Sequence, residues 1–273
     1  MEKFLRFPDW KEKCITLSYD DGIVYDKKLV EILDKYSLKC TFNLNSGLFG
    51  LGDIRLSKED AYELFSKSNH EIAIHGEKHL SLGQAKLIDG IIDISNDKQN
   101  LEFMYHRIVR GMAYANGTYN QQVKNYLKLL GISYARTCIS TGKFDIPTDW
   151  LELPATCHHN DPKLMDYLDI FLNDSHENSF EKKPLLFYLW GHSYEYNNDN
   201  NWYVIENFAK KAGNRDDIWY ATNIEIYDYV QAYNNIICSF DNSIIFNPSS
   251  ITVFLEINDK KYSIEPGKNI FLE

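Results

Sequence analysis

Two adjacent carboxylates and two histidines four residues apart are the side chains of this sequence best suited to chemistry. Asp20 and Asp21 lie near the N-terminus, and His75 and His79 follow further along the chain. One carboxylate and two neutral imidazoles can hold a borderline divalent cation and leave a coordination position open for water. The second carboxylate can then accept a proton from that water. The pattern therefore predicts a hydrolytic metal site.

Each half of this pattern also has a simpler interpretation. Adjacent aspartates before a glycine often cap a helix or shape a turn. A histidine pair at i and i+4 places both rings on one face of a helical turn, and such pairs also occur on solvated helices. The surrounding sequence favours the metal site, because residues 16–19 and 71–74 read as strands that lead into the two halves. Chemistry collects at the C-terminal ends of strands in α/β proteins.

Short apolar runs alternate with amphipathic stretches over the first 235 residues. The candidate strands are residues 14–19, 38–44, 70–75, 109–113, 132–138, 151–156, 185–190 and 218–221. The candidate helices are residues 25–36, 58–68, 119–130, 162–172, 202–211 and 224–233. Repeated strand-then-helix order predicts a parallel sheet, and seven or eight repeats predict closure. We therefore expect an α/β fold, an irregular TIM-like (β/α)7-8 barrel.

The hydrophobic pattern changes to a period of two near the C-terminus. Five short strand-like pieces, separated by turn signals, lie at residues 236–240, 243–246, 251–258, 260–264 and 269–272. We therefore expect a barrel over residues 1–235 and a small antiparallel β extension over residues 236–273 that packs on the barrel. A cover or an oligomer contact is the favoured role of this extension, and carbohydrate binding is the alternative.

The motifs resemble those of one known family. The Asp-Asp-Gly strand end and the His-x-x-x-His pair are similar to the first two motifs of the polysaccharide deacetylases, carbohydrate esterase family four. Residues 186–192, Leu-Phe-Tyr-Leu-Trp-Gly-His, resemble the late strand of that family, which ends in a catalytic histidine. The resemblance spans residues 10–235. It implies the barrel fold and the removal of N-acetyl groups from an amino-sugar oligosaccharide or polysaccharide.

The resemblance also implies roles for particular residues. Asp21, His75 and His79 match the metal ligands, which leaves Asp20 free to act as general base. His192 matches the general acid that protonates the leaving amine, a step that amide hydrolysis requires. A backbone N–H group in the turn around Asn116 is the implied donor to the developing oxyanion. For His192, a core histidine at a strand end is the alternative.

The third motif of the family departs from its usual form in this chain. It normally carries an arginine that orients the base aspartate, but residues 112–117 contain none. Arg110 and Arg136 are the candidates to replace it, and either charge would keep Asp20 ionised. We favour Arg136, because it lies near the end of a neighbouring predicted strand and would face the same rim. An arginine at the surface remains the alternative.

Substrate contacts are predicted from weaker signals. The fourth motif, Asp-x-x-Asp-Trp, is only loosely matched by residues 145–150, so Trp150 is expected either against the acetyl methyl group or in the core. His158 and His159 could serve a second metal site, but vicinal side chains on an extended segment point to opposite faces. We therefore expect only one of them, His159, to face the pocket. Trp190 is a candidate for stacking on a sugar ring.

The composition argues against several other classes of protein. The formal net charge is −10 without a Lys/Arg-rich run, so there is no electrostatic reason to expect a nucleic-acid partner. No segment reads as a membrane span or a signal-peptide core. The five cysteines, at positions 14, 40, 138, 157 and 238, are odd in number and scattered, which predicts free thiols in a reducing compartment. We therefore expect a cytoplasmic protein without a membrane partner; a secreted protein whose signal has been removed is the alternative.

Three functions stay open on the sequence alone. The first is a metal-dependent N-deacetylase whose partner is an acetylated saccharide, and the second is an amide (C–N) hydrolase acting on a small non-sugar substrate. The third is a catalytically silent carbohydrate-binding protein. The expected cofactor is one divalent metal ion, zinc first, with cobalt, nickel or manganese as alternatives. The sequence leaves the oligomeric state open.

Overall fold

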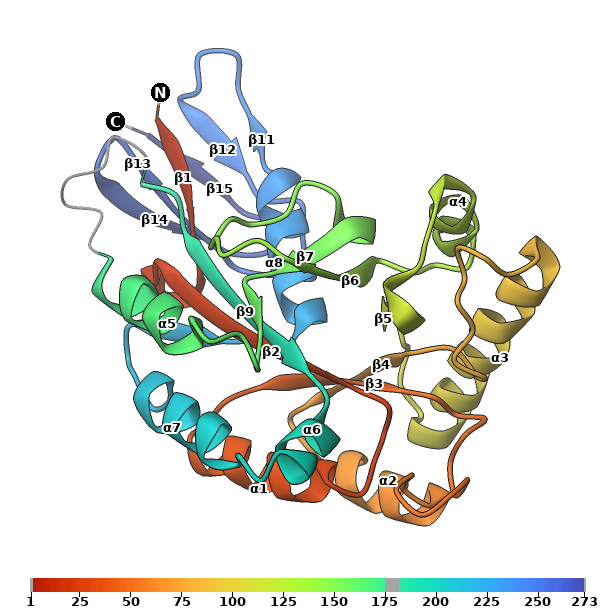
Figure 1. Cartoon of the computed structure of the whole chain (residues 1–273). Helices are drawn as coiled ribbons and strands as arrows, with labels where there is room; N and C mark the ends of the chain where they lie inside the picture. Colours follow the sequence, from red (N-terminus) through yellow and green to blue (C-terminus); the bar gives the residue numbers. More distant parts are fainter. Residues whose placement is uncertain (1, 175–181, 273) are drawn as a thin grey trace.

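A ring of parallel strands forms the core of this computed structural model, which describes residues 2–174 and 182–272 (Figure 1). The strands are β2 (Lys13–Asp20), β3 (Cys40–Leu44), β4 (Glu71–Ile74), β5 (Gly111–Ala113), β6 (Tyr134–Ser140), β7 (Leu153–Ala155), β8 (Cys157–His158), β9 (Leu185–Gly191) and β10 (Ile218–Tyr220). Their order is β7-β6-β5-β4-β3-β2-β9-β8, and β10 pairs with the first residues of β2.

The two ends of this sheet are joined by one extended segment. β7 and β8 are separated by a single residue, Thr156; β7 pairs with β6, and β8 pairs with β9. The backbone N–H of Thr156 donates to the carbonyl oxygen of Tyr188 in β9 at 2.9 Å, which continues the pairing between the two halves. The ring is therefore closed, and the predicted irregular TIM-like barrel is confirmed. β10 supplies an incomplete eighth strand.

Helices pack against the sides and one end of the ring (Figure 1). They are α1 (Asp26–Lys35), α2 (Lys58–Phe65), α3 (Leu87–Tyr105), α4 (Gln121–Leu129), α5 (Leu164–Asn173), α6 (Ser193–Asn198), α7 (Tyr203–Ala212) and α8 (Asn223–Asn234). Leu29 and Leu33 of α1 are buried in one apolar cluster with Leu17 of β2 and Phe42 of β3. Burial of each such side chain contributes roughly 1.5–3 kcal/mol, so the apolar stripe of α1 holds it against the strands.

The longest helix, α3, is not predicted by apolar periodicity, because its buried face is partly polar. Asp97 of α3 accepts hydrogen bonds from the backbone N–H groups of Ser46 at 2.8 Å and His75 at 3.0 Å. Asp93, one turn earlier, accepts a hydrogen bond from the N–H of Lys78 at 2.8 Å. The helix therefore anchors two loops at the rim of the barrel. Its carboxylates occupy positions that an amphipathic pattern assigns to apolar residues.

The C-terminal residues form short antiparallel strands, as their alternating pattern predicts. They are β11 (Ile237–Cys238), β12 (Ile244–Phe246), β13 (Val253–Ile257), β14 (Lys260–Ile264) and β15 (Asn269–Phe271). β11, β12 and β15 make one sheet, and β13 and β14 make another with the N-terminal strand β1 (Lys3–Arg6). Residues 3–6 thus pair with the C-terminal strands, although the sequence pattern groups them with the barrel. The division into two domains at residues 235 and 236 stays a prediction.

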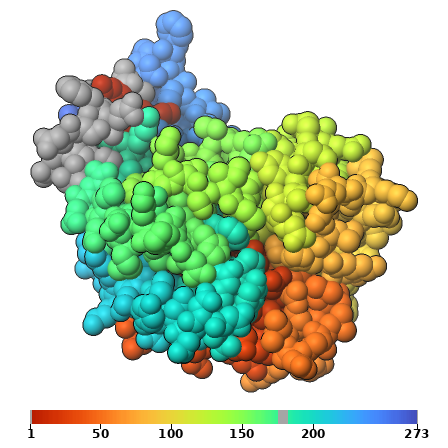
Figure 2. Space-filling model, viewed as in Figure 1, coloured from red at the N-terminus to blue at the C-terminus, as the bar shows by residue number. Residues whose placement is uncertain are grey.

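Atoms from the N-terminal part of the chain reach the surface on one face of the molecule. Figure 2 shows red N-terminal atoms between the teal surface near residues 190–200 and the orange surface near residues 40–60, the face where β2 ends. All five cysteines are free, and three of them are buried. None of the helices in the described part of the chain is long and apolar enough to cross a membrane.

Candidate metal centre

The end of β2 presents two carboxylates to the same rim. Asp20 is the last residue of β2, and Asp21 follows with a φ of 89°, outside the extended conformation of the strand. Adjacent side chains on a strand point to opposite faces, and this change of backbone direction removes that restriction. The N–H of Asp21 donates to the carbonyl oxygen of Asn43 at 2.9 Å, and Arg55 donates to the carbonyl oxygen of Asp21. Both backbone polar groups of Asp21, its N–H and its carbonyl oxygen, are therefore held by hydrogen bonds.

The two histidines lie in the loop after β4. The helical turn that their spacing predicted is wrong, because Gly76 and His79 have φ values of 85° and 58°, which turn the backbone away from a helix. A Cβ atom at position 76 would lie 2.4 Å from Oδ2 of Asp93, so the close approach of α3 requires glycine here. The loop still brings both imidazoles to the same side, with ring centroids 4.8 Å apart.

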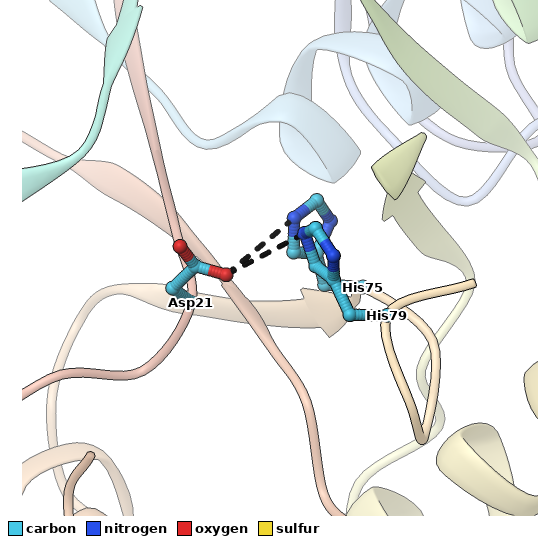
Figure 3. Close-up of side chains that lie close together, drawn as sticks. All are labelled: Asp21, His75 and His79. Carbon is cyan, nitrogen blue, oxygen red and sulfur yellow. Dashed lines mark ion pairs between the residues drawn. The ribbon is translucent and has the colours of Figure 1, made fainter. Parts of the chain in front are cut away.

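Asp21 points toward both imidazoles (Figure 3). Its Oδ1 atom lies 3.9 Å from Nε2 of His75 and 3.7 Å from Nε2 of His79. The three ligand atoms all lie within 4.8 Å of one another. Nδ1 of His75 lies 3.0 Å from the carbonyl oxygen of Ala113, which can only accept, so Nδ1 carries the proton and Nε2 keeps its lone pair.

The chemistry of these three residues fits a divalent cation. Oδ1 of Asp21 is buried and makes no hydrogen bond, although Arg55 lies 3.3 Å away. Burial lowers the pKa of His75 below its ordinary value, despite the opposing charges of Asp20 and Asp21, and so favours the neutral imidazole. A carboxylate oxygen without a hydrogen bond, together with two imidazole nitrogens, is a donor set that zinc and its neighbours accept. The predicted ligands therefore converge where a cation could sit.

Asp20 is held as a carboxylate by an arginine. Nη2 of Arg136, on β6, contacts both carboxylate oxygens, and Nδ2 of Asn43 donates to Oδ1 at 2.8 Å. Burial raises the pKa of Asp20, but the guanidinium charge, with His75 and His192, outweighs burial and holds this pKa well below its usual range.

Arg110, the other candidate for this contact, lies elsewhere in the structure. Its guanidinium forms a two-bond pair with Asp228 of α8, at 2.9 and 2.6 Å. Arg136 is therefore the arginine that reaches Asp20, and it does so from a strand end on the same rim.

His192 lies beside Asp20. It follows β9, and its Nε2 atom is 3.7 Å from Oδ2 of Asp20. Nδ1 of His192 lies 3.1 Å from Oε1 of Glu195, a carboxylate that can only accept. Burial lowers the pKa of His192, but Glu195 and Asp20 outweigh burial and raise it. Ser193, the next residue, donates to the buried carboxyl group of Asp26 at 2.6 Å, which anchors the start of α6.

His158 and His159 both turn toward Glu195, so the expectation that they face opposite sides is wrong. Their Nε2 atoms lie 3.3 and 2.8 Å from Oε2 of Glu195, and their ring centroids are 4.5 Å apart. β8 ends at His158 and the chain turns at His159, so the alternation of a strand no longer applies. Burial lowers the pKa of His158 to about 4 and also lowers the pKa of His159.

The predicted substrate contacts are placed differently from the expectation. Trp190 is 8% exposed and its ring lies under the guanidinium of Arg136 at 4.5 Å, so it supports the arginine and offers little surface to a sugar. His159 is 1% exposed and stacks on Tyr196 at 4.1 Å. Trp150 packs against Tyr227 of α8 and against a buried apolar cluster, which agrees with the core alternative.

The turn around Asn116 is the exposed member of the predicted substrate set. It forms the short 3-10 turn η2 (Ala115–Gly117), directly after the strand whose Ala113 carbonyl accepts from His75. Nδ2 of Asn116 donates to Oγ of Ser81 at 2.9 Å. The turn therefore lies beside the histidine loop.

The strand ends of the closed parallel barrel therefore carry two adjacent carboxylates and three histidines in close proximity. The sequence profile described as polysaccharide deacetylase matches residues 8–135, which contain the aspartate and histidine motifs. The match confirms the resemblance to the polysaccharide deacetylases over residues 8–135. None of the curated proteins compared with this sequence matches it.

Solved structures show the same fold. A putative polysaccharide deacetylase from Mycobacterium smegmatis matches with a TM-score of 0.58 and 15% identity, covering 84% of this chain and 94% of its own. A CE4 family pseudoenzyme from Bacillus anthracis matches with a TM-score of 0.51 and 14% identity, covering 82% and 68%. These two matches establish the fold. This chain spans 61% of a Streptococcus pyogenes deacetylase, PplD, solved with acetate; that match covers 50% of this chain with 22% identity and a TM-score of 0.46.

Proposed function

We propose that this protein is a metal-dependent deacetylase that removes N-acetyl groups from an amino-sugar oligosaccharide or polysaccharide. The observation that carries the proposal is the convergence of Asp21, His75 and His79 beside an ionised Asp20 and a second histidine, His192. The family of residues 8–135 supports deacetylation of a saccharide, and an acetylated saccharide is the proposed partner.

Asp21, His75 and His79 would hold the divalent cation. One oxygen and two nitrogen donors suit zinc first, and cobalt, nickel and manganese are the alternatives. When bound, such an ion lowers the pKa of water and polarises a carbonyl oxygen. The side chain of His79 is 26% exposed, so this edge of the ligand set faces solvent, from which substrate would arrive.

Asp20 would accept the proton of the attacking water. Arg136 keeps its carboxylate ionised, and Asn43 holds Oδ1. Oδ2 is the oxygen turned toward the site, because it lies 3.9 Å from Nε2 of His75 and 3.7 Å from Nε2 of His192. A base that is already charged, oriented and close to the ligand set needs little reorganisation when water attacks.

His192 would donate the proton that the leaving amine requires. As the bond between the carbonyl carbon and nitrogen breaks, the proton on Nε2 moves to the amine nitrogen and neutral imidazole remains. The raised pKa of His192 keeps it protonated at a higher pH than an ordinary histidine. A backbone N–H group of η2, around Asn116, is the proposed donor to the oxyanion.

A small non-sugar amide is the second candidate substrate. The placement of the aromatic side chains favours it, because Trp190 is buried under Arg136 and Trp150 lies against α8. Sugar-binding sites commonly use exposed aromatic rings, and Trp190, the residue expected to stack on a sugar, does not provide one. The contact of Arg136 with Asp20 argues against a silent binding protein, because it replaces the arginine that the third motif lacks.

Acetate release from N-acetylated chitooligosaccharides tests the proposed function. We expect turnover by the zinc-loaded protein, loss of at least roughly 100-fold on chelation, and recovery on addition of zinc. Acetate is measured with a coupled enzymatic assay over a panel that also contains small cyclic and linear amides. Release of ammonia or a small acid from the non-sugar amides alone would favour the second candidate. Saccharide binding by the metal-loaded protein without turnover would contradict both.

A further inference from the structure

We propose that Glu195 is the positioning residue for His192, and that the turn at residues 158–160 holds Glu195 in place. This inference rests on the proposed role of His192 as general acid and deepens it. Glu195 lies three residues after His192, in the first turn of α6, and its Oε1 atom accepts a hydrogen bond from Nδ1 of His192 at 3.1 Å. With Nδ1 committed to this bond, Nε2 faces Oδ2 of Asp20 at 3.7 Å.

The second oxygen of Glu195 is surrounded by polar side chains of the turn after β8. Nε2 of His159 lies 2.8 Å from Oε2, Nε2 of His158 lies 3.3 Å from it, and Nδ2 of Asn160 donates to it at 3.1 Å. Four polar groups on one carboxylate leave it little freedom to rotate. The other oxygen, Oε1, is therefore a fixed acceptor for His192. Glu195 lies 36 residues after His159, so the contact joins two distant segments of the chain.

His158, His159 and Glu195 are also close enough together to hold a cation. The hydrogen bonds of His158 favour the other interpretation, in which the histidines donate hydrogen bonds to the Glu195 carboxylate. The backbone N–H of Asn160 donates to Nδ1 of His158 at 3.2 Å, so Nδ1 is unprotonated. In a neutral imidazole the proton then lies on Nε2, the atom that faces Glu195. A protonated Nε2 donates to a carboxylate and cannot bind a cation.

A charged acceptor at Nδ1 has two consequences for a general acid. It fixes the ring orientation, and it stabilises the imidazolium form, which must be populated before the proton can be delivered. The titratable groups around His192 are Asp20 and Asp21 at the end of β2, Tyr194 and Glu195 on α6, and His158 and His159 at the end of β8. A substitution at Glu195 leaves the chemical identity of the others unchanged, so the difference between variants reports the Glu195 charge.

The direct test is the titration of His192 by ¹⁵N NMR in the full-length protein, with its signal assigned by its absence in His192→Asn. Glu195→Gln keeps an oxygen acceptor but removes the charge, so the pKa of His192 should fall by about one unit or more. Glu195→Asp keeps the charge and should recover part of the shift. In acetate release, Glu195→Gln should lower kcat roughly tenfold or more at alkaline pH with little change in KM. Its alkaline limb should move to lower pH, because the acid loses its proton earlier.

Glu225→Gln is the matched control. Glu225, like Glu195, is the third residue of its helix. It forms the capping box of α8, away from the site. We expect this variant to leave the titration of His192 and the pH profile unchanged. An unchanged pKa of His192 in folded Glu195→Gln and Glu195→Asp would overturn the proposal, as would a second equivalent of metal that is lost in Glu195→Gln. Absence of acetate release would count against the proposed function alone, because the NMR titration needs no substrate.

Discussion

Replacement of Asp20 by asparagine is expected to lower kcat for acetate release by roughly 100- to 10,000-fold. Asparagine keeps the size of the side chain and its contact with Asn43 but cannot accept the proton of the attacking water. The metal content should stay close to that of the unchanged protein, because Asp21, and not Asp20, carries the proposed ligand oxygen. Steady-state kinetics and elemental analysis of the same preparation measure both quantities.

Asp228→Asn is the control for this substitution. Asp228 pairs with Arg110 at the surface and makes the same kind of carboxylate–guanidinium contact as Asp20. We expect this variant to retain nearly full activity. Retention of activity in Asp20→Asn would assign the base to another group and contradict the mechanism.

Substitution of Arg136 by methionine should also lower kcat/KM strongly. The side chain is fully buried, and its removal leaves the Asp20 carboxylate buried without its main counter-charge. The pKa of Asp20, now held well below its usual range, should then rise. A base must be ionised, so the acid limb of the pH profile for kcat/KM should move to higher pH. The loss at neutral pH should reach roughly 100-fold or more.

Arg110→Met separates this effect from the loss of any arginine. Arg110 is partly exposed and lies on Asp228, so its removal should change kcat/KM by less than about twofold and leave the acid limb in place. Thermal unfolding of both variants shows whether Arg136→Met remains folded. A folded Arg136→Met with an unshifted acid limb would show that Asp20 does not depend on this guanidinium.

The position of the site could be predicted from sequence because it depends on strand ends. β2 and β4 lie on either side of β3 in a parallel sheet, so residues that follow them meet at one edge. The same argument places Arg136, on β6, at that edge, and the structure brings it to Asp20. In these cases a local sequence pattern and a topological rule are sufficient. The prediction requires only that the side chains lie at the same edge of the sheet, and it does not depend on the detailed path of the backbone.

The local backbone conformations could not be predicted in this way. The spacing of His75 and His79 indicates a helical turn, yet the approach of α3 to Gly76 produces a loop with positive φ values. Likewise, both His158 and His159 reach Glu195, because β8 is only two residues long. Short elements take their conformation from tertiary contacts, which a sequence pattern does not contain.

Residues whose roles depend on distant partners were missed for the same reason. Glu195 has one local signal, its position three residues after His192, but its contacts with the turn after β8 are visible only in the fold. The exposure of Trp190 was overestimated because a strand-end aromatic residue can face either substrate or core. Here it faces the core side, where Arg136 covers it.

Anomalous X-ray diffraction from crystals of the zinc-loaded protein, recorded above and below the zinc absorption edge, tests the central claim most directly. The account predicts an anomalous peak bonded to Oδ1 of Asp21 and Nε2 of both His75 and His79, at about 2.0–2.2 Å, and no such peak in crystals of His79→Ala. A fully zinc-loaded crystal without density among these three side chains, or with the ion bound elsewhere, would contradict it.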